Sequence, residues 1–116
     1  MNKNLKTAIL ASIKAGEEIM KVYNQNFTVE FKSDKSPLTL ADKNANKVIN
    51  QYLLKTAIPI ISEENTQIDY SERKNWLKCW IVDPLDGTKE FVKRNSEFTV
   101  NIALIKNRKP SLGVIY

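Results

Sequence analysis

The sequence of 116 residues contains no histidine and a single cysteine. Without histidine, the chain alone offers no Ser-His or Cys-His nucleophile pair and no His-ligated zinc site. Any metal bound here must be held by carboxylate, carbonyl and water oxygens, which favours Mg²⁺, Mn²⁺ or Ca²⁺. Cys79 cannot form an internal disulfide, so a reducing cytoplasm is the expected compartment.

Long apolar runs are also missing from the sequence. No stretch approaches the roughly 20 residues of a membrane span, and the N-terminus leads into an amphipathic pattern rather than the apolar core of a secretory signal. The composition, 42% hydrophobic and 27% charged, is ordinary for one soluble domain. The net charge of +5 suits an anionic ligand. Because the basic residues are scattered and form no aromatic-basic motif, a nucleic-acid partner is not expected.

Two amphipathic helices are predicted, over residues 4–23 and after Thr39. Thr39 can cap the second helix, and Asp42 then falls at the third helical position, the spacing of a capping box. The expected buried stripe of the first helix is Leu5, Ile9, Ile13, Gly16, Met20 and Tyr23. That of the second helix is Ala41, Ala45, Val48, Ile49, Tyr52 and Leu53.

Short apolar or alternating runs predict the strands. They cover residues 28–32, 59–61, 80–82, 97–105 and 111–116. Residues 33–37 form a polar loop from which Lys32 or Lys35 could reach a phosphate, and residues 66–79 form a polar connection with a helical piece around 70–78. The last strand is apolar and uncapped, so we expect an open sheet edge and an interrupted domain.

Acidic residues follow two of the apolar strands. Glu63 comes directly after the strand at 59–61, while Asp83 and Asp86 follow the strand at 80–82, in a bend that ends at Gly87. If the two strands are neighbours in one sheet, they lie about 4.8 Å apart, and the three carboxylates could then share one or two metal ions. After Gly87 and Thr88 the sequence can turn helical, which would direct free amides at an anion. This combination predicts metal-dependent phosphoryl transfer.

Three segments together resemble the inositol monophosphatase superfamily of Mg²⁺-dependent, lithium-sensitive phosphatases. They are residues 36–42, 62–64 and 80–88, and their order and spacing match along essentially the whole chain. Within the superfamily, residues 89–91 and 94–105 are most similar to the 3'(2'),5'-bisphosphate nucleotidases of the CysQ type. Inositol phosphatases usually carry Thr-Asn-Phe where this chain has Lys-Glu-Phe.

The resemblance implies an α+β fold, the N-terminal portion of the sugar-phosphatase fold, in which two amphipathic helices pack on a largely antiparallel sheet. The family has a further Trp-Asp motif in a C-terminal α/β half that supplies another metal-binding Asp and most nucleotide contacts. That motif is absent from this sequence. We therefore expect residues 1–116 to be a truncated N-terminal domain, with weak metal binding and little or no turnover alone.

The resemblance also implies the metal site. The ligands would be the carboxylates of Glu63, Asp83 and Asp86 and the main-chain carbonyl of Leu85. Two or more Mg²⁺ ions are expected in the complete enzyme.

In the same way the resemblance makes Asp42 and Thr88 catalytic, because they would position and activate the attacking water. The substrate-binding residues that it implies are Glu63, Leu85, Asp86, Gly87 and Thr88. Among these, the amides of Gly87 and Thr88 would hold the phosphate.

The implied reaction removes the 3'-phosphate of adenosine 3',5'-bisphosphate to give AMP, so the expected partner is a small phosphorylated nucleotide. Inositol phosphate and fructose 1,6-bisphosphate stay open as substrates, because the contacts that would reject them belong to the C-terminal half. A separate alternative is a non-catalytic module that self-associates through its open sheet edge.

Overall fold

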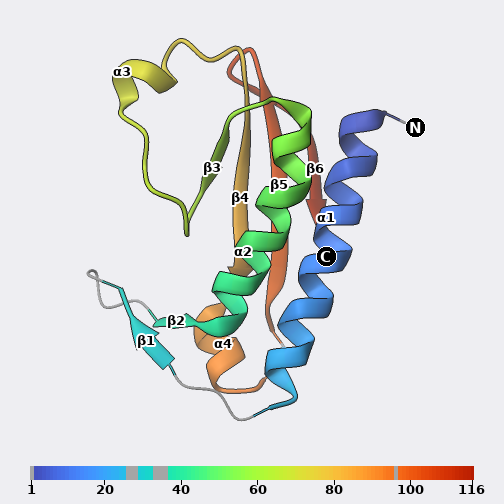
Figure 1. Cartoon of the computed structure of the whole chain (residues 1–116), viewed down its shortest axis with the longest axis vertical. Helices are drawn as coiled ribbons and strands as arrows, with labels where there is room; N and C mark the ends of the chain where they lie inside the picture. The colour runs from blue at the N-terminus through green and yellow to red at the C-terminus, as the bar shows by residue number, and fades with distance from the viewer. Residues whose placement is uncertain (1, 26–28, 33–36, 96) are drawn as a thin grey trace.

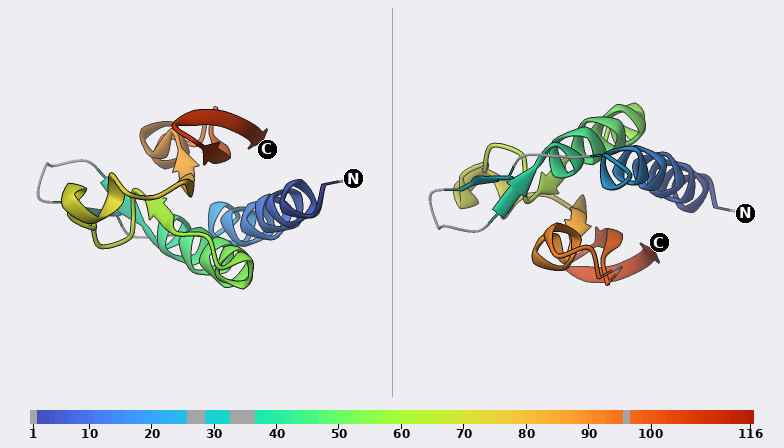
Figure 2. Two further views of the ribbon diagram at one scale, coloured as in Figure 1. Left: turned by 90° about the horizontal axis from the view of Figure 1, so that it is seen from above. Right: turned by 90° about the horizontal axis from the view of Figure 1, so that it is seen from below.

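A computed structural model of the chain describes residues 2–25, 29–32, 37–95 and 97–116, arranged in two layers (Figures 1 and 2). One layer holds helices α1 (Lys3–Tyr23) and α2 (Leu40–Leu53). The other is a sheet with the strand order β3 (Ile60–Ser62), β4 (Lys78–Asp86), β5 (Thr99–Lys106) and β6 (Lys109–Ile115). Strand β3 runs parallel to β4, and the other pairs are antiparallel. The predicted α+β architecture is confirmed.

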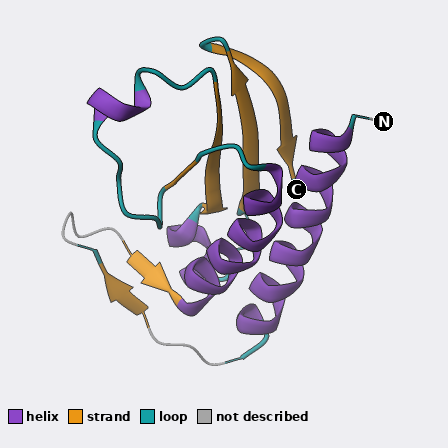
Figure 3. Ribbon diagram, turned by 45° about the horizontal axis from the view of Figure 1, so that its top comes forward, coloured by secondary structure: helices purple, strands orange, loops and turns teal. Residues whose placement is uncertain are grey.

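Smaller elements surround these layers. Strands β1 (Val29–Phe31) and β2 (Pro37–Thr39) form a separate antiparallel hairpin, drawn at the lower left of Figure 3, and β2 contacts α2 and α4 (Thr88–Val92). The other short helices are η1 (Leu54–Thr56) and α3 (Tyr70–Arg73). No described helix combines the length and the apolar character that a membrane crossing requires.

Two predicted boundaries need correction in the segments around these smaller elements. The polar loop was expected to extend to Pro37, but β2 begins there. The sequence did not predict this strand, because its three residues form a strand through pairing with β1. The rest of that loop, residues 33–36 with Lys35, lies outside the described residues. The helical piece predicted up to Lys78 ends at Arg73, since Lys78 already pairs with Lys106 in the sheet.

Helix α2 begins as the sequence predicted. The side chain of Thr39 accepts a hydrogen bond from the amide of Asp42, and the Asp42 carboxylate accepts one from the amide of Thr39 at 2.9 Å, which completes the capping box. Its buried apolar residues are Ala41, Ala45, Ile49 and Leu53. Val48 and Tyr52, also predicted in this stripe, are half-buried.

The predicted buried stripe of α1 was partly wrong, because Leu5, Ile9, Gly16 and Tyr23 are half-buried and the other two members are exposed. Met20 is 43% exposed and Ile13 is 36% exposed. The residues that are buried instead are Ala8, Ala11, Ser12, Ala15, Ile19 and Val22. Helix α1 packs mainly against α2, whose facing side is also rich in alanine. Small side chains let the two helices approach closely, so the alanine stripe faces inward and the larger apolar residues lie at its flanks.

Strand β4 carries the irregularity that shapes the site. Asp83 pairs with Asn101, and Asp86 pairs with Thr99, so β4 uses one more residue than β5 between these pairs. This extra residue is a β-bulge. Pro84 and Leu85 are consequently both buried, and Asp83 and Asp86 emerge on the same side of the strand. The prediction that the strand ends at Val82 was wrong, because pairing continues to Asp86.

The sheet face opposite the helices is open and apolar. Ile81 and Ile115 on this face are 46% and 76% exposed, and they line a hollow of about 640 Å³ that reaches Glu63 and Asp83. Strand β6 is an outer strand of the sheet. Self-association through this edge stays a prediction.

Candidate active site

An acidic cavity of about 320 Å³ lies where β4 meets α4 and the turn after β3. Its lining residues are Lys32, Glu63, Glu64, Asp83, Leu85, Asp86, Gly87, Thr88, Lys89 and Glu90. Five of these side chains are carboxylates and two are ammonium groups. The excess of negative charge in a confined space favours a bound cation. The structure therefore brings Glu63 together with the residues of the Asp83–Thr88 segment, as the sequence predicted.

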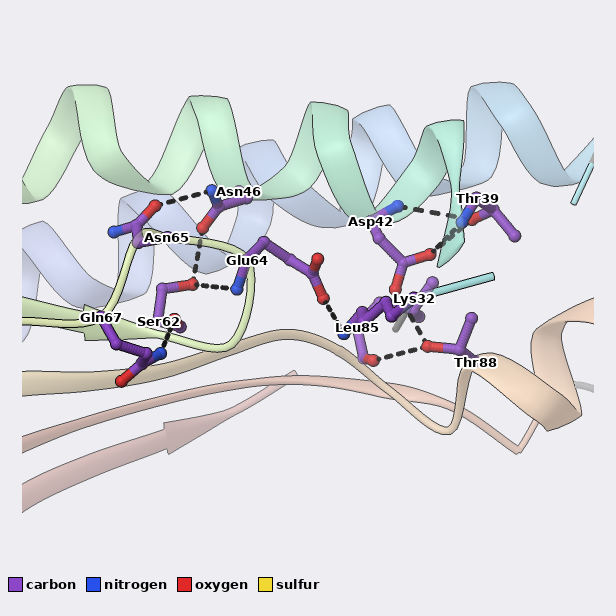
Figure 4. Close-up of polar contacts among 10 residues, drawn as sticks. All are labelled: Lys32, Thr39, Asp42, Asn46, Ser62, Glu64, Asn65, Gln67, Leu85 and Thr88. Carbon is purple, nitrogen blue, oxygen red and sulfur yellow. Dashed lines mark hydrogen bonds and ion pairs between the residues drawn. The ribbon is translucent and has the colours of Figure 1, made fainter. Parts of the chain in front are cut away.

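Asp42 lies behind this cavity and is linked to it through Thr88 (Figure 4). The hydroxyl of Thr88 donates to one carboxylate oxygen of Asp42 at 2.9 Å, across 46 residues of sequence. The other oxygen of Asp42 accepts from the amide and the hydroxyl of Thr39. Asp42 is only 2% exposed. The start of α2 thus faces the segment after β4, and Asp42 both caps the helix and contacts the site.

The carboxylates are close enough to repel one another. Burial, together with the negative charges of Glu63 and Asp86, raises the pKa of Asp83 to about 6, although a hydrogen bond from the backbone of Leu85 acts in the opposite direction. Asp86 is also held by the side-chain amide of Asn101, which donates to it at 3.1 Å. A cation in the cavity would relieve the repulsion.

The donor set fits a hard divalent cation such as Mg²⁺, because all of its atoms are carboxylate and carbonyl oxygens. Within the described part of the chain, however, no three acidic, histidine or cysteine side chains are close enough to bind a single ion. The repulsion among the carboxylates is compatible with this finding. Charges influence each other over about 10 Å, whereas Mg²⁺ ligands must lie about 2 Å from the ion. The assignment of Glu63, Asp83, Leu85 and Asp86 as ligands stays a prediction.

Lys32 reaches the cavity from the segment after β1. Its ammonium group lies 2.6 Å from a carboxylate oxygen of Glu64, and the two side chains are 26% and 12% exposed. Burial lowers the pKa of Lys32, but the hydrogen bond and charge of Glu64 outweigh this effect and the pKa is raised. The ammonium group therefore stays charged beside the site, where the sequence suggested it could reach a phosphate.

Gly87 connects the bulge to α4 in a conformation that favours glycine. Its φ is +93°, and a Cβ atom placed there would lie 2.7 Å from the carbonyl oxygen of Glu97. Helix α4 follows directly, as predicted, and is anchored by Phe91, whose ring packs against Tyr23 and Phe98 at centroid distances of 5.4 Å and 5.3 Å. The backbone at Gly87 and Thr88 is thereby fixed.

Sequence reasoning missed two residues of the site. Glu64 was treated only as part of an acidic segment, yet it pairs with Lys32. Asn101 binds Asp86 and lies opposite Asp83 in the sheet. A signal for Asn101 was available, because it interrupts an otherwise apolar strand.

Comparisons with known proteins find similar sequences and structures. The model of the inositol monophosphatase family matches residues 1–116. A 3'(2'),5'-bisphosphate nucleotidase CysQ from Salmonella typhimurium is 52% identical over 106 residues, which are 88% of this chain and 43% of that protein. One from Haemophilus influenzae is 38% identical over 114 residues, 97% of this chain and 42% of that protein. The chain thus spans about two fifths of the length of these curated relatives.

Solved structures show the same relationship. The crystal structure of CysQ from Bacteroides thetaiotaomicron, described as a bacterial member of the inositol monophosphatase family, superposes with a TM-score of 0.84 at 52% identity. The match covers 97% of this chain and 41% of that one. The extragenic suppressor protein suhB from Bartonella henselae gives a TM-score of 0.87 at 31% identity, covering 99% of this chain and 45% of that one.

Proposed function

This chain belongs to the inositol monophosphatase family, and on that premise we propose that residues 1–116 form the N-terminal domain of a Mg²⁺-dependent phosphatase. The substrate is adenosine 3',5'-bisphosphate, and the products are AMP and phosphate. The observation that carries the proposal is the hydrogen bond between Thr88 and Asp42 at the edge of an acidic cavity. A cytoplasmic location is part of the same proposal.

Thr88 and Asp42 prepare the attacking water. The Thr88 hydroxyl has two acceptors within reach, the Asp42 carboxylate at 2.9 Å and the Leu85 carbonyl at 3.2 Å. When it donates its one hydrogen to the nearer Asp42, its oxygen can accept a hydrogen bond from water. As the water attacks phosphorus, its proton passes to Thr88, and the hydroxyl proton of Thr88 passes to Asp42. The two hydrogen bonds from Thr39 hold the Asp42 carboxylate in place during this transfer.

Four groups hold the metal in this proposal: the carboxylates of Glu63, Asp83 and Asp86 and the carbonyl of Leu85. When bound, Mg²⁺ stabilises the charge on the phosphoryl oxygens and on the leaving oxygen. Glu63, Leu85 and Asp86 also border the substrate.

The phosphate itself is bound by the amides of Gly87 and Thr88. The glycine conformation allows the backbone to approach the ligand closely, since no side chain intervenes. The charged Lys32 ammonium group adds a positive charge to the lining of the cavity.

The choice of substrate is supported by the relatives whose printed function is that of a 3'(2'),5'-bisphosphate nucleotidase. Inositol and sugar phosphates are the competing substrates. Because the chain covers about two fifths of those proteins, we expect weak Mg²⁺ binding and little or no turnover for the 116 residues alone.

Two measurements test the proposal. The first is calorimetric titration of the chain with Mg²⁺ at pH 7.5, where Asp86→Asn should abolish the binding and Asp69→Asn, an exposed control, should not. The second is phosphate release by a chimera in which this chain replaces the matching segment of the Salmonella relative. The chimera should hydrolyse adenosine 3',5'-bisphosphate, and Asp42→Asn should reduce the rate about 100-fold or more. The absence of Mg²⁺ binding, or an active Asp42→Asn chimera, contradicts the proposal.

A further inference from the structure

A cluster of uncharged polar side chains joins α2 to the turn after β3 (Figure 4). The hydroxyl of Ser62 donates to the Oδ1 atom of Asn46 at 2.6 Å, and the Nδ2 atom of Asn46 donates to Oδ1 of Asn65 at 2.9 Å. Asn65 and Asn50 donate to each other at 3.0 and 3.3 Å. Asn50 in turn donates to Oδ1 of Asn46 at 3.0 Å. Asn46 therefore uses both ends of its amide, and it is the member that contacts all the others.

This cluster fixes the backbone on both sides of Glu63. The hydroxyl oxygen of Ser62 accepts a hydrogen bond from the amide of Glu64 at 3.3 Å. The amide of Asn65 donates to the main-chain carbonyl of Ser62 at 3.1 Å, which closes the turn. On the sheet side, the amide of Glu63 donates to the carbonyl of Val82 at 3.3 Å. The turn that carries Glu63 is thus held to α2 by side chains and to β4 by its backbone.

The same face of α2 carries the other half of the site. Asp42, Asn46 and Asn50 are spaced four residues apart, so they lie along one side of the helix. Asp42 binds Thr88 at one end of this row, and the two asparagines bind the Glu63 turn further along. One helix therefore sets the position of Glu63 relative to Asp42.

We propose that Asn46 is a positioning residue for the metal site, acting through Ser62 and Asn65 on the carboxylate of Glu63; this inference rests on the proposed function. The negative charges of Asp83 and Asp86 lie across the same cavity and repel Glu63 in the absence of a cation. The Asn46 cluster opposes this repulsion by holding the turn in place, so less reorganisation is needed when the metal binds.

An asparagine suits this role better than the alternatives. It both donates and accepts, which an aspartate at the same place could not do, and it adds no charge beside a group of carboxylates. A leucine of similar size would leave the buried Ser62 hydroxyl without its acceptor.

The test uses three variants of the 116-residue chain. Asn46→Ala removes both ends of the amide, and Ser62→Ala removes the hydroxyl that links Asn46 to Glu64. Asn75→Ala is the matched control, because Asn75 is exposed and its side chain donates to the Ser71 carbonyl at a distance of 3.4 Å. For each variant we would measure the Mg²⁺ dissociation constant by calorimetry, the hydrogen-exchange rate of the Glu64 amide by NMR, and the thermal midpoint.

The expected result is a 10-fold or greater rise in the Mg²⁺ dissociation constant for Asn46→Ala and Ser62→Ala at a temperature where both are folded. The Glu64 amide should exchange faster in both, and Asn75→Ala should match the parent chain. If the parent binds Mg²⁺ and Asn46→Ala binds it equally well, the positioning role is refuted while the proposed function stands. If the parent does not bind Mg²⁺, both fail together. Should Asn46→Ala not fold, Ser62→Ala, which removes one hydroxyl, decides the question by the same criteria.

Discussion

Replacing Asp83 by asparagine should make the metal-free chain more stable. Burial and the charges of Glu63 and Asp86 raise the pKa of Asp83 from 3.8 to about 6. The difference of about two pKa units, at about 1.4 kcal/mol each, sets an upper limit near 3 kcal/mol on the cost of ionising this group in the folded chain. Because Asp83 is half-buried, solvent screening reduces the expected gain to about 1 kcal/mol.

The sign of the pH dependence follows from the direction of the pKa change. Between about pH 4 and pH 6 the folded chain binds more protons at Asp83 than the unfolded chain does. Stability of the parent chain must therefore fall as the pH rises through this window. Asp83→Asn removes this penalty, so its advantage should be full at pH 7.5 and should shrink as the pH falls towards 4.

The assay is thermal unfolding followed by circular dichroism, in EDTA and in 10 mM Mg²⁺. In EDTA at pH 7.5 the thermal midpoint of Asp83→Asn should rise by about 5 °C. Mg²⁺ should stabilise the parent chain and leave the variant unchanged. Asp69→Asn controls for net charge, since it removes an exposed carboxylate that does not line the cavity. A lower midpoint for Asp83→Asn in EDTA, or an equal rise for Asp69→Asn, would refute the argument.

Two further predictions concern the cavity wall. Gly87→Ala should lower the free energy of unfolding by about 1–3 kcal/mol, because φ is +93° and the added Cβ would lie 2.7 Å from a backbone oxygen. In Gly113→Ala the nearest atom lies at 4.0 Å, so its denaturant midpoint should barely move. Lys32→Met should cost about 1 kcal/mol, because it leaves the nearly buried Glu64 carboxylate without its partner. Lys14→Met breaks an exposed ion pair and should lower the free energy of unfolding by less than about 0.5 kcal/mol. All four variants are compared with the parent chain by denaturant titration.

The features that depend on neighbouring residues were predictable from the sequence. The capping box of Thr39 and Asp42 involves four consecutive residues, and the turn at Gly87 depends on one residue and its successors. The placement of β3 beside β4 was a condition of the metal-site hypothesis, and the structure meets it. The proposed ligands accordingly line one cavity.

The features that depend on distant contacts were not predictable in this way. The first helix has two candidate faces, and only the close approach of α2 selects the one lined by Ala8, Ala11 and Ala15. The pairing of Lys32 with Glu64 spans 32 residues and has no sequence signal. Asn46 resembles an ordinary exposed helix residue until the turn carrying Ser62 is placed against it.

The bulge in β4 makes the arrangement of the two aspartates depend on chain length as well as on residue type. In a regular strand, positions 83 and 86 would face opposite sides, because side chains alternate. The additional residue reverses this alternation, and both carboxylates open onto one cavity. Deleting either Pro84 or Leu85 would retain both acids and still rotate Asp86 into the apolar layer beneath the sheet. Scanning this segment by single substitutions would not reveal this dependence, because every substitution keeps the bulge residue in place. A scan of single-residue deletions would reveal it.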